Sequence, residues 1–194
     1  MGRSKEFDKT LVLHKAMEVF GHYGYEGTSL PNLLAGLGIA RQSLYDTYGT
    51  KRDLFLTAVK HYANEKSAKV IAYLERPGSV KKNISDIFLE AVAVLQDELR
   101  RKECFIMQSA IDQVPHDAQL AQFFNADIAR IEEAFYEALL KAKQQNELSA
   151  HINLEMLARY LTHARYSLTQ AAKLSTDPKV LDDIAAVILT TLES

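Results

Sequence analysis

The stretch Ile39–Lys51 reads IARQSLYDTYGTK, and its residue types predict a short helix with one solvent-facing side. Apolar residues at helical spacing run from about Ala40 to Tyr48, and Gly49 is typical of the residue that ends a helix. Most of the polar side chains are hydrogen-bond donors, but Asp46 places a carboxylate in the middle. The segment is therefore either a helix that lies against DNA or ordinary helical surface.

Two further helices are predicted before this segment. The nearer one begins after Thr28 or Ser29, whose hydroxyls can cap free amides, and ends at the GLG of residues 36–38. The first runs from about Phe7 to Tyr23, and Gly24 stops it. Three short helices with a tight turn between the last two have helix-turn-helix geometry, in which the last helix can enter the major groove of DNA.

Helical spacing continues to the C-terminal end and strand signals are nearly absent, so the sequence predicts an all-α protein. A long helix follows Thr50 as far as about Leu74, and the Pro77-Gly78 pair ends it. A fifth helix opens at Ser79, with an apolar stripe through Leu99, and Arg100, Arg101 and Lys102 are expected at its C-terminal end. The later helices are predicted at CFIMQSAIDQV, around residues 120–139, at Leu154–Lys173 and at Pro178 to about Leu192.

Three motifs carry a family resemblance. Beginning at Ala16, the chain reads A-x-x-V-F-x-x-x-G-Y-x-x-T-S-L, then G-I-A-R-Q-S-L-Y, then G-T-K-x-x-L-F. These motifs, over about 50 residues, closely resemble the N-terminal domain of the TetR family of transcriptional regulators. The resemblance implies a helix-turn-helix DNA-binding domain at residues 1–50 and a larger helical regulatory and dimerisation domain at 51–194, about nine helices in all, with the long helix from about 50 to 74 linking them.

The resemblance also implies which residues meet DNA. Arg41, Gln42 and Ser43 occupy the groove-facing start of the recognition helix, where Arg can read guanine and Gln can read adenine. Phosphate contacts, which set the register of the protein on DNA, are expected from other donors. Those residues are Thr28 and Ser29, which cap the second helix, together with Tyr45, Tyr48 and Lys51.

Two positions depart from the family pattern. Ala40 stands where the family usually has a serine cap, a loss of about 1 kcal/mol in typical hosts. Asp46 lies near a helix C-terminus, where an acid opposes the helix dipole and would repel phosphates. We expect Asp46 either to accept from a cytosine amino group or to point into solvent.

The last two predicted helices resemble the half of a four-helix dimer interface that this family forms. The interface residues implied by this comparison are Leu157, Leu161, Ala164, Leu168, Val180, Ile184 and Ile188. The alternative is that the apolar residues of both helices pack only inward.

Family members usually bind a small ligand among their middle helices. The candidate ligand contacts are Phe105, Met107, Gln108, Phe124, Tyr136, His163 and Tyr166. Ordinary core packing is the alternative for each of them.

The remaining chemistry-bearing residues give few signals. Cys104 is either a sensor of oxidants or electrophiles, favoured by the cations before it, or a buried and inert thiol, favoured by the apolar residues after it. The six histidines form no H-x-x-x-H or H-x-x-E-H pattern, so no metal site is expected. No cofactor motif, serine elbow, P-loop or paired-carboxylate grouping is present, and the sequence does not predict an enzyme.

Composition agrees with a globular protein, at 47% hydrophobic and 25% charged residues. No stretch is long and apolar enough to span a bilayer and the N-terminal residues lack a signal-peptide core, so we expect a cytoplasmic protein without a membrane partner. The net charge is −2, yet residues 1–60 hold 8 Lys and Arg against 6 Asp and Glu, whereas the remainder holds 15 against 19. The basic excess thus lies at the end that contains IARQSLYDTYGTK.

These observations predict a homodimeric, ligand-responsive transcriptional regulator, in the first instance a repressor. Its expected partners are a pseudo-palindromic double-stranded DNA operator, a second copy of the chain and a small-molecule effector whose identity the sequence does not indicate. Two alternatives are an all-helical small-molecule-binding protein and a dimerising antagonist that lacks sequence-specific DNA binding. Ala40 and Asp46 are the only residues that favour the antagonist.

Overall fold

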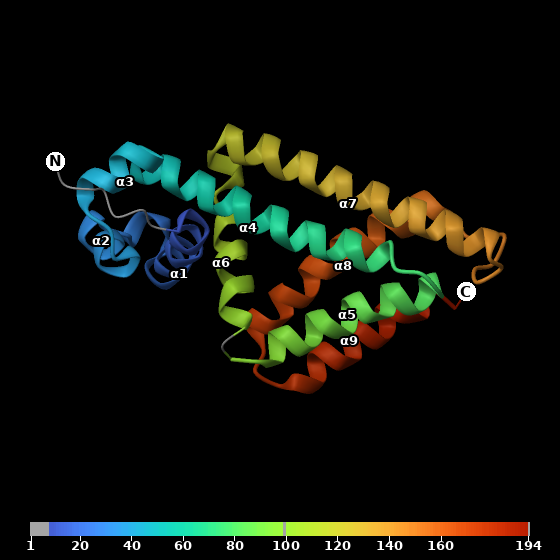
Figure 1. The fold of residues 1–194 in the computed structure, drawn as a ribbon. Coiled ribbons are helices and arrows are strands. Elements are labelled where there is room, and N and C mark those ends of the chain that lie inside the picture. The colour runs from blue at the N-terminus through green and yellow to red at the C-terminus, as the bar shows by residue number, and fades with distance from the viewer. Residues whose placement is uncertain (1–7, 99, 194) are drawn as a thin grey trace.

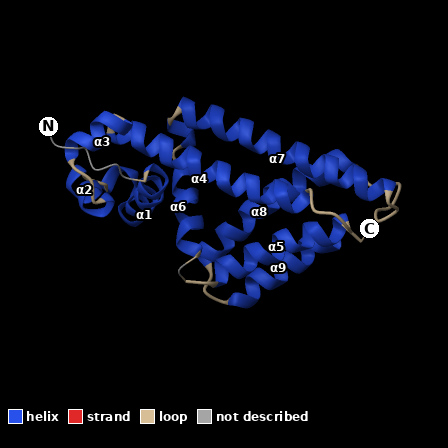
Figure 2. Cartoon of the chain, in the orientation of Figure 1, coloured by secondary structure: helices blue, strands red, loops and turns tan. Residues whose placement is uncertain are grey.

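The computed structural model describes residues 8–98 and 100–193, and every regular element in them is a helix (Figures 1 and 2). The all-α prediction is therefore confirmed. The elements in chain order are α1 (Lys9–Gly27), α2 (Leu30–Leu37), α3 (Arg41–Tyr48), α4 (Lys51–Leu74), α5 (Val80–Gln96), α6 (Arg101–Ile111), the 3-10 helix η1 (Val114–His116), α7 (Ala118–Gln144), α8 (Leu154–Leu174) and α9 (Pro178–Thr190). No helix in this part of the chain is long and apolar enough to cross a membrane.

Two hydrophobic cores lie along the long helix α4, which runs from the small N-terminal unit into the larger bundle (Figure 1). The first core joins α1, α2 and α3 to the first half of α4, with Phe20, Leu33, Leu44 and Leu54 fully buried. The second core lies among the rest of α4 and helices α5, α7, α8 and α9. The fold thus separates a small three-helix head from a helical body.

The first core does not stop at the head. Ile106 and Ala110 of α6, and Leu120 and Phe124 of α7, are buried in the same cluster as the residues of α1, α2 and α3. Gly21 permits this closeness, because a Cβ added there would lie 1.9 Å from Cγ1 of Ile106. Helices of the body are therefore packed directly into the base of the head.

Several predicted helix ends are confirmed by their caps. Ser29 Oγ accepts from the amide of Asn32 at the start of α2, and Thr50 Oγ1 accepts from the amide of Asp53 at the start of α4. Gly38 ends α2 with a left-handed backbone, at φ 67°. Gly24 has the predicted non-helical conformation, but α1 resumes after this kink and continues to Gly27.

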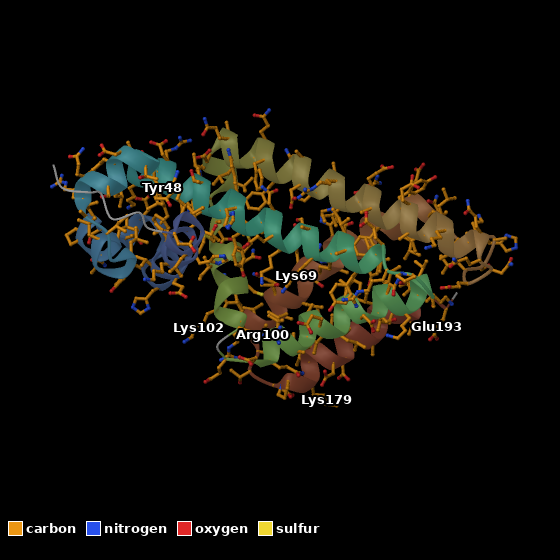
Figure 3. The ribbon with its side chains drawn as sticks, viewed as in Figure 1. Tyr48, Lys69, Arg100, Lys102, Lys179 and Glu193 are labelled. Carbon is orange, nitrogen blue, oxygen red and sulfur yellow. The ribbon has the colours of Figure 1, made fainter. Side chains whose placement is uncertain are left out.

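The boundary between α5 and α6 differs from the prediction. α5 ends at Gln96, because the backbone of Asp97 is extended. Arg100 is the N-cap residue of α6 and Arg101 is in its first turn, so these cations lie at a helix N-terminus and not at the C-terminus of α5. Figure 3 shows Arg100 and Lys102 at this junction. The Arg100 guanidinium is compensated by Glu90 of α5, 2.6 Å away. Leu99, the predicted end of the α5 stripe, lies outside the described residues.

Candidate nucleic-acid interface and ligand cavity

Helix α3 is held on the head by one buried side chain and presents the rest of its surface outward. Leu44 is fully buried, whereas Arg41, Gln42 and Tyr45 are exposed and Ser43 is half-buried. Residues at spacings of three and four lie on one helical face, so Arg41, Gln42 and Tyr45 form a single outward surface. α2 and α3 are joined across the Gly38 turn, which gives the head the helix-turn-helix arrangement that the sequence predicts.

The N-terminus of α3 lacks a side-chain cap. Ala40 is the N-cap residue and makes no side-chain hydrogen bond, unlike Ser29 at α2 and Thr50 at α4. The free amides of the first turn of α3 are therefore left to solvent or to a bound anion such as a DNA phosphate.

Asp46 is exposed, as one of its two expected situations requires, and it also has a partner within α3. The side-chain amide of Gln42 donates to the Asp46 carboxylate at 2.7 Å, across one turn of α3. One position before Gln42, the guanidinium of Arg41 lies 5.7 Å from the ring centroid of Tyr45. Asp46 thus contacts the side chain of Gln42, and Tyr45 contacts that of Arg41, each from one turn later in α3.

The residues expected at phosphates surround α3 with one exception. Ser29 is exposed at the start of α2. Lys51 begins α4, and its ammonium lies 4.7 Å from the centroid of the Tyr25 ring of α1. Tyr48 is at the junction of α3 and α4 (Figure 3) and donates to the carbonyl of Lys9 at 3.1 Å. Partial burial raises the pKa of the Tyr48 hydroxyl, so it remains a donor.

Thr28 is the exception. Its side chain is only 2% exposed, and its hydroxyl donates to the carbonyl of Gly24 at 2.6 Å. The prediction that Thr28 caps α2 is wrong, because Ser29 provides that cap and Thr28 closes the C-terminal end of α1. The Thr28 hydroxyl is therefore buried in the head and is not placed for a phosphate contact.

A cavity of about 190 Å³ lies in the body among α4, α5, α6, α7 and α8. Of the residues predicted to contact a ligand, Met107, Gln108, Phe124 and Tyr166 line it, and Cys104 lines it as well. Phe105 packs against the second core instead. Tyr136 lies on a groove between α7 and α8, and His163 on a groove between α8 and α9. The cavity thus gathers four of the seven predicted residues.

A charged group that the sequence reasoning missed lines the cavity. Arg165 of α8 makes no hydrogen bond or ion pair with any of the described residues, and burial lowers the pKa of its guanidinium. The two lining carboxylates have partners elsewhere. Asp127 accepts from Ser67 at 2.7 Å and from Arg130 at 2.5 Å, and Glu90 pairs with Arg100. The described lining thus holds three cations, Lys66, Lys69 and Arg165, and neither of its two carboxylates forms an ion pair with Arg165.

The expected dimer residues fall into two groups. Five of them are buried in the core of the single chain: Leu157, Leu161, Ala164, Leu168 and Ile188. Ile184 and Val180 are half-buried. The outward apolar surface of the two helices is formed instead by Met156, Tyr160 and Val187, which are 66%, 42% and 64% exposed. Ala164 lines the shallow groove between α8 and α9, with Tyr160, Ile184 and Val187.

Comparison with known proteins gives concordant results. Residues 12–58 match the model of the bacterial regulatory proteins of the tetR family. The chain is 57% identical, over the full length of both proteins, to the HTH-type transcriptional regulator YezE of Bacillus subtilis. It is 26% identical over 189 residues to the HTH-type transcriptional repressor ComR of Escherichia coli, covering 97% of this chain and 90% of ComR.

The fold is also similar to solved structures. A cysteine mutant of the TetR family regulator CifR, complexed with 26 bp double-strand operator DNA, superimposes with a TM-score of 0.82 at 25% identity. The match covers 97% of this chain and 98% of the CifR chain. Both the head and the body are therefore included in the similarity.

Proposed function

Because this chain belongs to the TetR family of helix-turn-helix, DNA-binding transcriptional regulators, we propose that it is a homodimeric repressor controlled by a small molecule. It binds a pseudo-palindromic operator through two copies of α3 and changes its DNA affinity when an effector occupies the cavity. Residues 1–50 act as the DNA-binding domain and residues 51–194 as the regulatory and dimerisation domain. The relatives are regulators, and the protein is not an enzyme.

One observation carries the ligand response: the cavity and the base of the DNA-binding head share residues. Tyr62, Ala63 and Phe124 are buried in the first core, with the residues of α1, α2 and α3, and all three also line the cavity. A molecule that moves these side chains must repack the base of the head, because close-packed interiors transmit displacement. The two sites thus act on one shared element, which is the requirement for allosteric coupling.

The cavity favours an anionic effector with an apolar part. Arg165 supplies a half-buried guanidinium that forms no ion pair with a described carboxylate, and the walls include the apolar side chains of Val70, Ile87 and Phe124. A charge-assisted hydrogen bond to a guanidinium is strong, so a carboxylate that pairs with Arg165 gains affinity. A volume of about 190 Å³ suits a molecule of one ring or a short chain, since an apolar cavity of about 150 Å³ can hold benzene.

Dimer formation explains how two short helices specify one operator. A two-fold dimer reads two half-sites one helical turn or a multiple apart, which multiplies the specificity of a single α3. The exposed apolar residues of α8 and α9, including Tyr160 and Val187, form the surface for the second copy. The structure of CifR is titled as a complex with operator DNA, which supports operator binding by this chain. ComR is named a repressor, which supports repression.

A mobility-shift titration with DNA that flanks the gene of this protein tests the proposal. We expect binding with clear sequence preference, a steep dependence on salt and a stoichiometry of two chains per site. The double variant Arg41→Ala, Gln42→Ala is the control, and it should retain only weak, non-specific binding. Binding by the wild-type protein without sequence preference or salt dependence would overturn the proposal.

A further inference from the structure

Three potential metal ligands that the sequence analysis did not identify lie close together between the head and the body. His14 lies on α1, whereas His61 and Glu65 lie one turn apart on α4. The Nε2 atom of His14 is 3.3 Å from Oε2 of Glu65, and Nε2 of His61 is 3.6 Å from Oε1 of the same carboxylate. One ligand atom from each of the three residues lies within 4.8 Å of the other two.

Hydrogen bonding does not explain this arrangement. Nε2 of His61 is buried and has no hydrogen-bond partner among the described residues, the only such side-chain atom found in them. Its distance of 3.6 Å from Glu65 is too long for a hydrogen bond. A buried polar atom left without a partner is unfavourable by roughly 1–3 kcal/mol, so a group that meets Nε2 of His61 is stabilising.

We propose that His14, His61 and Glu65 bind a divalent transition-metal ion of the zinc class. The edge of a tetrahedron around zinc, with bonds of about 2.05 Å, is about 3.3 Å long. The separations of 3.3 and 3.6 Å between the carboxylate oxygens and the imidazole nitrogens are close to this value. Two imidazoles and one carboxylate suit zinc and its neighbours, whereas magnesium and calcium prefer oxygen ligands. A water molecule completes the fourth position.

The location of the site gives the ion a regulatory consequence. The metal joins α1, which belongs only to the head, to the middle of α4, which continues into the body. Tyr62, next to His61, lines the cavity, and its ring lies 6.5 Å from that of His14. The bound ion fixes the orientation of the head on α4. DNA affinity and metal affinity are therefore linked, and each must change the other by the same factor.

Titration of Co²⁺ into tag-free, full-length protein that has been stripped with a chelator tests the site without DNA. Tetrahedral Co²⁺ has intense visible absorption bands, and we expect these bands to saturate at one ion per chain and to disappear when Zn²⁺ is added. His14→Ala and Glu65→Gln should each weaken binding by at least the roughly 10- to 100-fold that loss of a supporting second-shell residue causes. Both residues are partly exposed, so these variants are expected to fold.

Matched controls separate a built site from adventitious surface binding. His151→Ala and Glu133→Gln remove the same side chains at exposed positions on the body and should leave the titration unchanged. Equal Co²⁺ binding by the wild type, His14→Ala and Glu65→Gln would overturn the metal site, as would the absence of tetrahedral bands. Circular dichroism of each variant checks that lost binding does not reflect unfolding.

The link to DNA is measured separately, by operator titrations with Zn²⁺ and with chelator. We expect the affinity of the wild type to differ between the two conditions and that of Glu65→Gln to be the same in both. If the Co²⁺ bands saturate but the operator affinity of the wild type is the same with Zn²⁺ and with chelator, the regulatory link is overturned. Because the metal titration contains no DNA, its failure is distinguishable from failure of the proposed repressor function.

Discussion

The side-chain amide of Gln42 donates a 2.7 Å hydrogen bond to the carboxylate of Asp46, one turn later on the outward face of α3. A carboxylate only accepts hydrogen bonds, so Nε2 of Gln42 must face Asp46 and Oε1 must face away. This fixes which edge of the amide is offered to a base. We therefore propose that Asp46 orients the amide of Gln42.

Replacing Asp46 with Ala is therefore expected to relax specificity at the base pair read by Gln42. Bidentate base contacts discriminate by about 1–3 kcal/mol, and part of this should be lost when the amide can rotate. Asp46→Asn keeps an acceptor for Gln42 and removes the charge, so it should retain the preference. Binding selection from a randomised operator library measures both. Unaltered specificity in Asp46→Ala would rule out the orienting role.

Lys51→Ala should weaken binding to all DNA sequences by a similar factor. The Lys51 ammonium lies at the start of α4, beside the Tyr25 ring and close to α3, where it is placed for a phosphate and not for a base. Loss of one phosphate contact is expected to reduce the slope of log affinity against log salt by about 1. Lys173→Ala removes the same charge at the far end of α8 and is the control. A change confined to one operator sequence would contradict the phosphate role.

Gly21→Ala is expected to separate α1 from α6. The added Cβ would lie 1.9 Å from Cγ1 and 3.1 Å from Cβ of Ile106, so the helices themselves must shift. Overpacking of this kind destabilises by about 1–3 kcal/mol, although alanine is intrinsically the better helix former. Gly27→Ala, where the nearest atom is 4.0 Å away, is the matched control and should not destabilise. Urea denaturation compares the two, and equal stabilities would refute the close contact.

Val187→Glu should convert the proposed dimer to monomers without unfolding the chain. Val187 is 64% exposed on α9, so the charge meets water in the monomer but an apolar partner in the dimer. Leu89→Glu places the same charge at a 55% exposed position on α5 and should leave the dimer intact. Light scattering after size-exclusion chromatography gives the mass. A dimer that survives Val187→Glu would move the interface away from this face.

Arg165→Gln should abolish the response to small organic anions. Benzoate and phenylacetate are expected to raise the melting temperature of the wild type more than benzamide does, because only the anions neutralise Arg165. Without an anion, Arg165→Gln should be as stable as the wild type or more stable, since it removes a half-buried cation that has no ion-pair partner among the described residues. Arg159→Gln removes a surface cation that pairs with Glu132 and is the control. If benzoate and benzamide raise the melting temperature of the wild type equally, the proposal of an anionic effector is wrong.

Local features of the chain were predictable because they depend on neighbours in sequence. Ser29 and Thr50 cap their helices, and Gly38 ends α2, through hydrogen bonds and backbone angles that span no more than one turn. The outward position of Arg41 and Gln42 follows from the period of the helix around buried Leu44. The pairing of Gln42 with Asp46 is also a spacing of four, which could have been recognised from the sequence.

The functional groups in the body were less predictable. Asp127 occurs three residues after Phe124 on the buried face of α7, a weak sign of an internal polar group. Nothing near Arg165 in the sequence shows that the carboxylates around its cavity are already paired, because their partners come from α4, α7 and the N-cap of α6. The inward packing of Leu161 and Leu168 likewise depends on which face of α8 meets the core.

The sequence by itself determined the helices, the helix-turn-helix and the donors on α3, since helical periodicity and capping are local. Tertiary structure alone decided that Thr28 is buried, that Arg165 forms no ion pair with a described residue and that His14 meets His61 and Glu65. These relationships depend on how the helices pack, and the spacing of residues along one helix does not determine them. The shared core of head and body also depends on tertiary structure, because it forms only where α6 packs against α1 and α7 packs against α4.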